Sequence, residues 1–214
     1  MEISLIGHAS FKLRGKTATV VTDPFDPKVM GIKFPKTTAD IVTVSHSHPD
    51  HSFVGVLEGD NLVIEGPGEY EVKGVKIWGV PTFHDTTNGK ERGKNTVYRM
   101  EIDRVSIVHL GDLGHKLTDV QVDSLDGVDI LLVPVGGFYT IDGEVAAAIS
   151  SQLEAKIVIP MHYNRRDLDQ KRFGKLAGVD VFLKEMGKSG IIPQPKLLIT
   201  KEKLPLEPTV VVLE

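Results

Sequence analysis

Four short runs rich in β-branched residues are each followed, within a few positions, by histidine or aspartate. Such runs, bounded by Gly, Asp and Pro, predict buried strands. The run IVTV at 41–44 leads into SHSHPDH at 45–51, and three later runs lead into His84, Asp112 and His162. Because the ends of strands in stacked sheets converge along one edge, a fold with these strands would collect these side chains on one rim.

The predicted elements change in kind along the chain. Strands are expected at residues 1–6, 11–14, 17–22, 40–44, 61–65, 69–72, 75–80, 95–102, 105–110, 129–135 and 156–160. Helices are expected at 117–125, 142–155 and 165–178, and the tail at 193–214 is expected to form strands broken by prolines. The dipeptides at 73–74 and 103–104 are typical of hairpin turns. The first half of the chain contains mainly strands, and the second half alternates strands and helices. This order predicts two sheets with helices packed outside.

Composition narrows the class of protein. The chain has 214 residues, a formal net charge of −4 and no cysteine. The charge argues against non-specific nucleic-acid binding, and the lack of cysteine excludes disulfides and thiolate metal sites. The first ten residues do not resemble a secretory signal, and no apolar run is long enough to span a bilayer. We therefore expect a cytoplasmic protein without a membrane span.

The segment at 45–51 concentrates groups that bind metals. His46, His48, Asp50 and His51 lie on one short loop, and imidazole and carboxylate are ligands that suit zinc. Four ligands this close cannot all reach one tetrahedral ion without strain. Two ions fit better, the first on His46 and His48 and the second on Asp50 and His51. The remaining ligands are expected from the other strand ends, at His84, Asp112 and His162.

The whole set resembles the metallo-β-lactamase fold superfamily, whose signature is a His-x-His-x-Asp-His loop followed by a later His, Asp and His. The segments GHASF at 7–11 and VVTDPF at 20–25 resemble a small cytoplasmic branch with ascorbate-phosphate lactonase-like and phospholipase D-like metal-dependent hydrolases. The resemblance implies an α/β (α+β) fold, a four-layer αββα sandwich of two mixed sheets face to face with helices outside. It also implies one domain over residues 1–214.

The resemblance further implies roles for individual residues. His46, His48 and His84 would hold a first zinc ion, and Asp50, His51 and His162 a second, with Asp112 between them. Asp23 would support the ligand loop from behind. Two Zn²⁺ per chain are expected, with Mn²⁺ and Fe open as alternatives. A hydroxide bridging the two ions would attack the substrate, and Asp50 would orient it and carry a proton to the leaving group.

The substrate is less defined. Candidate contacts are His8, His115, Gly137, Tyr139 and Arg165, each with an ordinary structural role as the alternative. Arg165 could bind an anionic group through forked hydrogen bonds. A small-molecule ester, lactone or phosphodiester is the expected substrate. A compact nuclease or cyclic-nucleotide phosphodiesterase and a non-catalytic metal-binding module stay open, and the sequence gives no oligomeric state.

Overall fold

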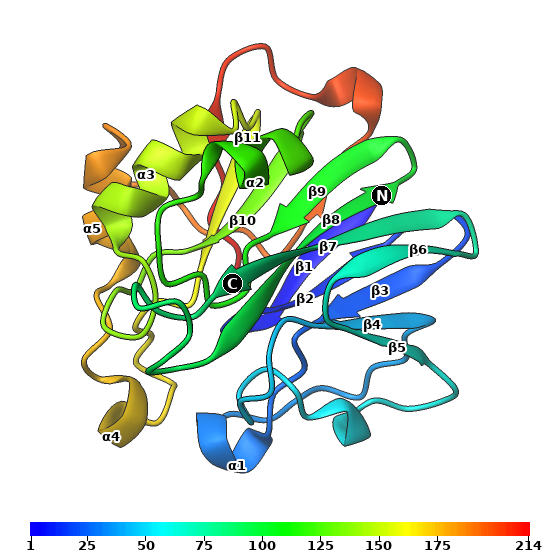
Figure 1. Cartoon of the computed structure of the whole chain (residues 1–214), viewed down its shortest axis with the longest axis horizontal. Coiled ribbons are helices and arrows are strands. Elements are labelled where there is room, and N and C mark those ends of the chain that lie inside the picture. The colour runs from blue at the N-terminus through cyan, green and yellow to red at the C-terminus, as the bar shows by residue number, and fades with distance from the viewer.

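Two mixed β-sheets pack face to face, as the cartoon of the computed structural model shows (Figure 1), and the structure describes all residues 1–214. In spatial order the first sheet contains β12 (Leu197–Leu198), β1 (Glu2–Gly7), β2 (Ser10–Arg14), β3 (Thr19–Thr22), β4 (Ile41–Val44) and β5 (Leu62–Glu65). The second contains β13 (Thr209–Val210), β11 (Ile157–Met161), β10 (Ile130–Pro134), β9 (Val105–His109), β8 (Lys94–Ile102), β7 (Val75–Phe83) and β6 (Gly68–Val72).

The helices lie outside the sheets. They are α1 (Pro27–Met30), α2 (Asp119–Ser124), α3 (Gly143–Gln152), α4 (Gln170–Phe173) and α5 (Val179–Glu185), with short 3₁₀ turns at Val54–Val56 and Lys201–Lys203. In Figure 1, α2, α3 and α5 cover the second sheet, whereas α1 and the 3₁₀ turn at Val54–Val56 lie beside the first. Phe173 of α4 packs in one cluster with Met30 of α1. The predicted sandwich with helices outside is confirmed. None of the helices has the length and hydropathy needed to cross a bilayer.

The central strands alternate between two cores. In β10, Ile130 and Leu132 face the space between the sheets, where they join a cluster of 22 buried residues. Leu131 and Val133 face the other way and join a second cluster beneath the helices. Because side chains alternate along a strand, a strand buried on both faces is a continuous apolar run. This explains why IVTV and ILLVP lack polar alternation.

One helix prediction is wrong in extent. Of the expected helix at 165–178 only the four residues of α4 are helical, while α5 follows immediately and was not predicted. The Asp169 carboxylate accepts the backbone N–H of Lys171 and caps a helix that starts there, and Gly174 ends it one turn later. Local capping therefore overrode the weak helical pattern.

Both predicted hairpin turns are confirmed. Lys73 and Gly74 have φ of 50° and 78°, and Asp103 and Arg104 have φ of 52° and 68°. Positive φ at both central residues is the type I′ geometry, which matches the twist of the flanking strands. These turns set the register of β6–β7 and β8–β9.

Strand direction brings the predicted side chains together. In the first sheet β1, β3 and β4 run the same way, because β2 is antiparallel to β1 and β3 while β3 and β4 are parallel. In the second sheet β7, β9, β10 and β11 run together for the same reason. The carboxyl ends of these strands form one rim of the sandwich. Residues that directly follow them therefore meet there.

Candidate metal centre

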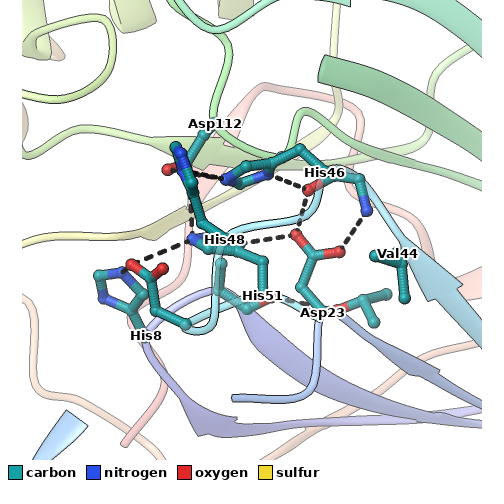
Figure 2. A network of polar contacts seen from close by, with 12 residues as sticks. His8, Asp23, Val44, His46, His48, His51 and Asp112 are labelled. Carbon is teal, nitrogen blue, oxygen red and sulfur yellow. Dashed lines mark hydrogen bonds and ion pairs between the residues drawn. The ribbon is translucent and has the colours of Figure 1, made fainter. Parts of the chain in front are cut away.

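The candidate ligands on the rim come from six segments, each of which follows the end of a strand. His8 follows β1, Asp23 follows β3, and the loop from Ser45 to His51 follows β4. The other three contributions come from the second sheet, where His84 follows β7, Asp112 follows β9 and His162 follows β11. Figure 2 shows His8, Asp23, His46, His48, His51 and Asp112 from close by.

Two groups of potential metal ligands lie side by side. The first contains His46, His48 and His84, whose ligand atoms all lie within 4.8 Å of one another. Nε2 of His46 is 3.0 Å from Nδ1 of His48. Two ring nitrogens that face each other this closely can be ligands of one ion, because zinc–nitrogen bonds are about 2.0–2.1 Å long.

The second group contains His8, Asp50, His51 and His162, again within 4.8 Å. Oδ2 of Asp50 lies 3.7 Å from Nε2 of His51 and 3.7 Å from Nε2 of His8. The rings of His8 and His162 are 3.9 Å apart between centroids. This group holds three imidazoles and one carboxylate, a donor set that suits zinc.

Asp112 lies between the two groups. Its Oδ2 is 3.1 Å from Nε2 of His84 and 3.7 Å from Nε2 of His46, both in the first group. The same oxygen lies 3.3 Å from Nε2 of His162, and Oδ1 lies 3.2 Å from Nε2 of His51, both in the second group. One buried carboxylate therefore faces both groups of imidazoles.

Asp23 holds the ligand loop from behind (Figure 2). Its Oδ1 accepts the backbone N–H of Ser45 at 2.8 Å, and its Oδ2 lies 2.8 Å from Nδ1 of His51. The Ser45 hydroxyl donates to Oδ2 and lies 2.9 Å from Nδ1 of His46. A partner on Nδ1 fixes the tautomer and leaves Nε2 directed into the site, which is the usual arrangement behind a metal-bound histidine.

The backbone around the rim is strained and tightly packed. His8, Asp23 and His162 have φ of 56°, 39° and 53°, a left-handed conformation that is uncommon outside glycine. A side chain on Gly136 would place its Cβ 2.2 Å from the carbonyl oxygen of His162, and one on Gly114 would lie 2.3 Å from the backbone of His84. Strain of this kind persists where the surrounding structure enforces it, and it is common at functional sites.

Burial and charge set the protonation of the site. Burial lowers the pKa of His8 and of His46 to about 3, so both rings are neutral at pH 7. Burial acts on His51 in the same direction, but the carboxylates of Asp112 and Asp50 outweigh it and raise the His51 pKa well above its usual value. The Asp112 pKa lies well below its usual range because His162 and His51 outweigh the effect of burial.

Several buried polar atoms at the rim have no hydrogen-bond partner. They are Nδ1 and Nε2 of His8, Nε2 of His51, Nδ1 of His84, Nδ1 of His162 and Oδ1 of Asp112. Buried polar atoms are nearly always paired, because an unpaired one costs about 1–3 kcal/mol. Of these atoms, Nε2 of His8, Nε2 of His51 and Oδ1 of Asp112 face the two groups of ligands, and cations bound there would be their missing partners. The residues present therefore fit the metal that the fold implies.

A cavity of about 380 Å³ opens onto these residues. Its wall contains His48, Asp50, His84, Asp112 and His162 together with Val29, Pro49, Arg92, Tyr139, Arg172 and Phe173. Catalytic pockets of this size accept small molecules. The arrangement can therefore present a bound small molecule to both groups of ligands at once.

A family model described as a β-lactamase superfamily domain matches residues 2–162. The chain belongs to the metallo-β-lactamase superfamily. A metal-dependent hydrolase from Thermoplasma acidophilum is 31% identical over 216 residues, covering 88% of this chain and 93% of that protein. The chain is accordingly a metal-dependent hydrolase.

Solved structures agree with this assignment. A protein from Thermotoga maritima, assigned to the Zn-dependent hydrolases of the superfamily, is 42% identical with a TM-score of 0.82, covering 100% of this chain and 98% of that chain. An isothiocyanate hydrolase from Delia radicum gut bacteria is 14% identical with a TM-score of 0.69, covering 94% of this chain and 100% of that chain. The second likeness shows the fold alone.

Within this metallo-β-lactamase fold only one of the five expected substrate contacts, Tyr139, lies on the cavity wall. His115 instead connects backbone segments, because its Nε2 accepts the N–H of Phe83 and its Nδ1 lies 2.7 Å from the carbonyl oxygen of Lys116. Arg165 pairs with Asp167 at 2.9 Å.

The two other expected contacts also lie off the wall. Gly137 adopts φ of 62° in a turn, and its N–H donates to the carbonyl oxygen of Ile141. The His8 side chain has no exposed surface and lies against His162 and Phe173. Neither residue is part of the cavity wall.

Sequence reasoning missed three residues around the site. Arg92 and Arg172 line the cavity wall. Asn95 holds the Asp112 loop, since its Oδ1 accepts the N–H of Asp112 at 2.9 Å and its amide donates to the carbonyl oxygen of Leu110. Arg92 lies in the loop after β7 and Arg172 in the short helix α4, and neither position carries a local pattern that points to a site. Asn95 begins the run at 95–102 that was predicted as a strand, and a polar residue at that position is the one sequence signal that could have pointed to it.

Proposed function

We propose that this protein is a dinuclear zinc hydrolase that cleaves a small anionic ester, lactone or phosphodiester. The observation that carries the proposal is the position of Asp112, whose two oxygens lie within 3.3 Å of His51 in one ligand group and His84 in the other. A structural zinc ion is usually bound by four protein ligands of its own. A carboxylate shared between two groups of ligands is therefore not expected at a structural site.

The ligands would divide as the superfamily resemblance implies. His46, His48 and His84 would hold the first ion, Asp50, His51 and His162 the second, and Asp112 would contact both. Two bound divalent ions lower the pKa of a shared water and polarise the oxygen of the scissile bond. Asp50 lines the cavity, and its carboxylate would orient the attacking water and pass a proton to the leaving group.

The anionic character of the substrate is supported by two arginines. The Arg92 guanidinium lies 5.7 Å from the centre of the Tyr139 ring, and the Tyr139 hydroxyl donates to the carbonyl oxygen of Arg172 at 3.0 Å. Nε of Arg172 lies 3.9 Å from Oδ2 of Asp169, a distance too long for a hydrogen bond. Arg92 and Arg172 thus offer guanidinium groups to the same cavity, and guanidinium binds carboxylate and phosphate in a forked geometry.

Metal content and turnover test the proposal together. Protein purified without chelators should contain about two zinc ions per chain. It should hydrolyse at least one member of a panel of bis(p-nitrophenyl) phosphate, a lactone and a thioester. His51→Ala and Asp112→Ala should remove both the turnover and part of the metal, whereas His115→Ala, outside the cavity, should keep both. Metal-free protein, or turnover that survives in both ligand variants, would refute the proposal.

A further inference from the structure

His8 is buried without any hydrogen-bond partner. Its side chain has no exposed surface, and neither Nδ1 nor Nε2 contacts a donor or acceptor at hydrogen-bond distance. A neutral imidazole carries one donor and one acceptor, and leaving both unpaired in a protein interior is costly. The backbone of His8 also has φ of 56°, a left-handed conformation that is uncommon outside glycine. Both features are unfavourable for a histidine that serves only packing.

A second buried histidine shows what a structural role looks like in the same fold. Nε2 of His109 lies 2.8 Å from the carbonyl oxygen of Ala9, and its Nδ1 accepts the N–H of Gly111 at 3.2 Å. Both ring nitrogens of His109 are therefore paired with backbone groups. His8 differs from His109 in this respect although both are buried.

The His8 ring instead faces the second group of ligands. Its Nε2 lies 3.7 Å from Oδ2 of Asp50, and its ring is 3.9 Å from that of His162 and 5.4 Å from that of His51. A ligand atom of His8 lies within 4.8 Å of those of Asp50, His51 and His162. Because the ring is also sealed from the cavity, contact with the substrate does not explain it.

We propose that His8 is an additional ligand of the second metal ion, beside Asp50, His51 and His162. This inference rests on the proposed dinuclear site. It makes the two sites unequal, since the second ion would have five chain ligands counting Asp112, whereas the first would have four, His46, His48, His84 and Asp112. The second ion would therefore be the one that resists removal.

Counting the metal-bound histidines in the unaltered protein tests this directly. The chain has eight histidines, and excluding His109 and His115 leaves six. In protein loaded with Co²⁺, each bound imidazole gives paramagnetically shifted ring signals, which ¹⁵N labelling of histidine identifies. Six sets of shifted histidine signals are expected. Five sets, with the unshifted set assigned to His8, would overturn the inference.

His8→Asn provides the second test, because asparagine tolerates the left-handed conformation and removes the imidazole. The variant should lose the His8 signals and bind the second ion at least tenfold more weakly in competition with a chromophoric chelator, since even residues behind the ligands change metal affinity by about 10–100-fold. The first ion should bind as before. Partial chelation of the unaltered protein should remove the first ion before the second.

His109→Asn is the matched control, as a buried histidine outside both ligand groups. It should lower the melting temperature of the metal-free protein, and any loss of metal affinity should affect both ions alike, because His109 holds Gly111 beside the shared residue Asp112, whereas His8→Asn should weaken only the second ion. His8→Asn should leave the metal-free melting temperature unchanged or raise it. If the unaltered protein binds two ions and His8→Asn binds both with the parent affinity, only the role of His8 fails. If the unaltered protein binds no metal, the proposed function fails.

Discussion

Nδ1 of His51 lies 2.8 Å from Oδ2 of Asp23, a residue 28 positions earlier in the chain and at the end of a different strand. Asp23 is fully buried, and its pKa is lowered, since the neighbouring histidines outweigh the effect of burial. The ionised carboxylate of Asp23 thus holds the proton of His51 on Nδ1. The Nε2 atom is left for the centre of the site, where Asp112 lies.

Asp23→Asn should therefore weaken metal binding without removing a ligand. We expect a loss of about 10–100-fold in affinity, because the amide cannot accept from both His51 and Ser45 as the carboxylate does. Chelator competition measures it. Asp60→Asn, an exposed residue in the loop before β5, is the control and should not change affinity. Equal affinities in the two variants would contradict the supporting role of Asp23.

Zinc should stabilise the protein, because the ligand groups are preformed in the folded chain and absent from the unfolded one. At a free concentration 100 times the dissociation constant, each site adds about 2.7 kcal/mol to the free energy of unfolding. In Asp112→Asn this gain should fall sharply, since the variant loses the charge that both groups share. Thermal melts with and without zinc measure the gain. An unchanged gain in the variant would show that Asp112 is no ligand.

The metal-free protein should be most stable near pH 6.5. The pKa of His8 and of His46 is held at about 3, so below pH 6.5 the unfolded chain takes up protons there that the folded chain does not. Each histidine then lowers the free energy of unfolding by roughly 1.4 kcal/mol per pH unit. The His51 pKa is raised, so its contribution is complete below pH 6.5 and is lost as the pH rises through the folded value.

Thermal melts of chelator-treated protein between pH 5 and 9 test this profile. The melting temperature should fall on both sides of the maximum, and His8→Asn should flatten the acid side. A monotonic profile would show that these rings do not stay in the assigned protonation states. Bound zinc should shift the maximum upward in pH, because protons compete with the metal for the same nitrogens.

The sequence predicted those parts of the site that depend on short-range pattern. His46, His84 and His162 each follow an apolar run, and strand direction alone brings such positions to one rim. Arg92 and Arg172 could not be found this way. They become neighbours only when the loop after β7 and the segment around α4 pack against the same cavity, a consequence of tertiary structure with no periodic signal.

The same limit explains the wrong extent of the helix predicted at 165–178 and the unexpected position of the His8 ring. The helix at 165–178 had an apolar pattern, but capping by Asp169 and the stop at Gly174 decided its length. His8 was predicted as a substrate contact from its place at a strand end. The bulge in β1 near Gly7 and the left-handed turn at His8 carry its ring behind the cavity wall, and neither is encoded in a pattern of apolar residues.

Arg92→Ala and Arg172→Ala should each impair turnover of anionic substrates selectively. A hydrogen bond to a charged group contributes about 1.5–3 kcal/mol when buried, and the partial exposure of these side chains reduces this to roughly a tenfold loss in kcat/KM. A neutral substrate with the same scissile bond should be unaffected. Arg165→Ala is the control, because that guanidinium pairs with Asp167 outside the cavity. Equal losses on both substrates would argue against anion binding.

The Tyr98 hydroxyl ties the second sheet to the loop that carries the ligands. It lies 3.0 Å from the carbonyl oxygen of Val44, 3.2 Å from that of Ile64 and 3.3 Å from that of Gly66, and Tyr98 is fully buried in β8. Val44 is the last residue of β4, directly before Ser45. Tyr98→Phe leaves these buried carbonyl groups without their shared donor, so we expect a loss of about 1–3 kcal/mol in the free energy of unfolding.

Because Val44 directly precedes the ligand loop, the same change should also weaken metal binding, although Tyr98 contacts no ligand side chain. Denaturant unfolding of the metal-free protein and chelator competition measure the two effects separately. Tyr70→Phe is the matched control, since the Tyr70 hydroxyl makes only a 3.5 Å contact with the carbonyl oxygen of Pro67 at the surface. It should change neither quantity. If Tyr98→Phe lowers stability but keeps the parent metal affinity, β4 holds the loop without help from the second sheet.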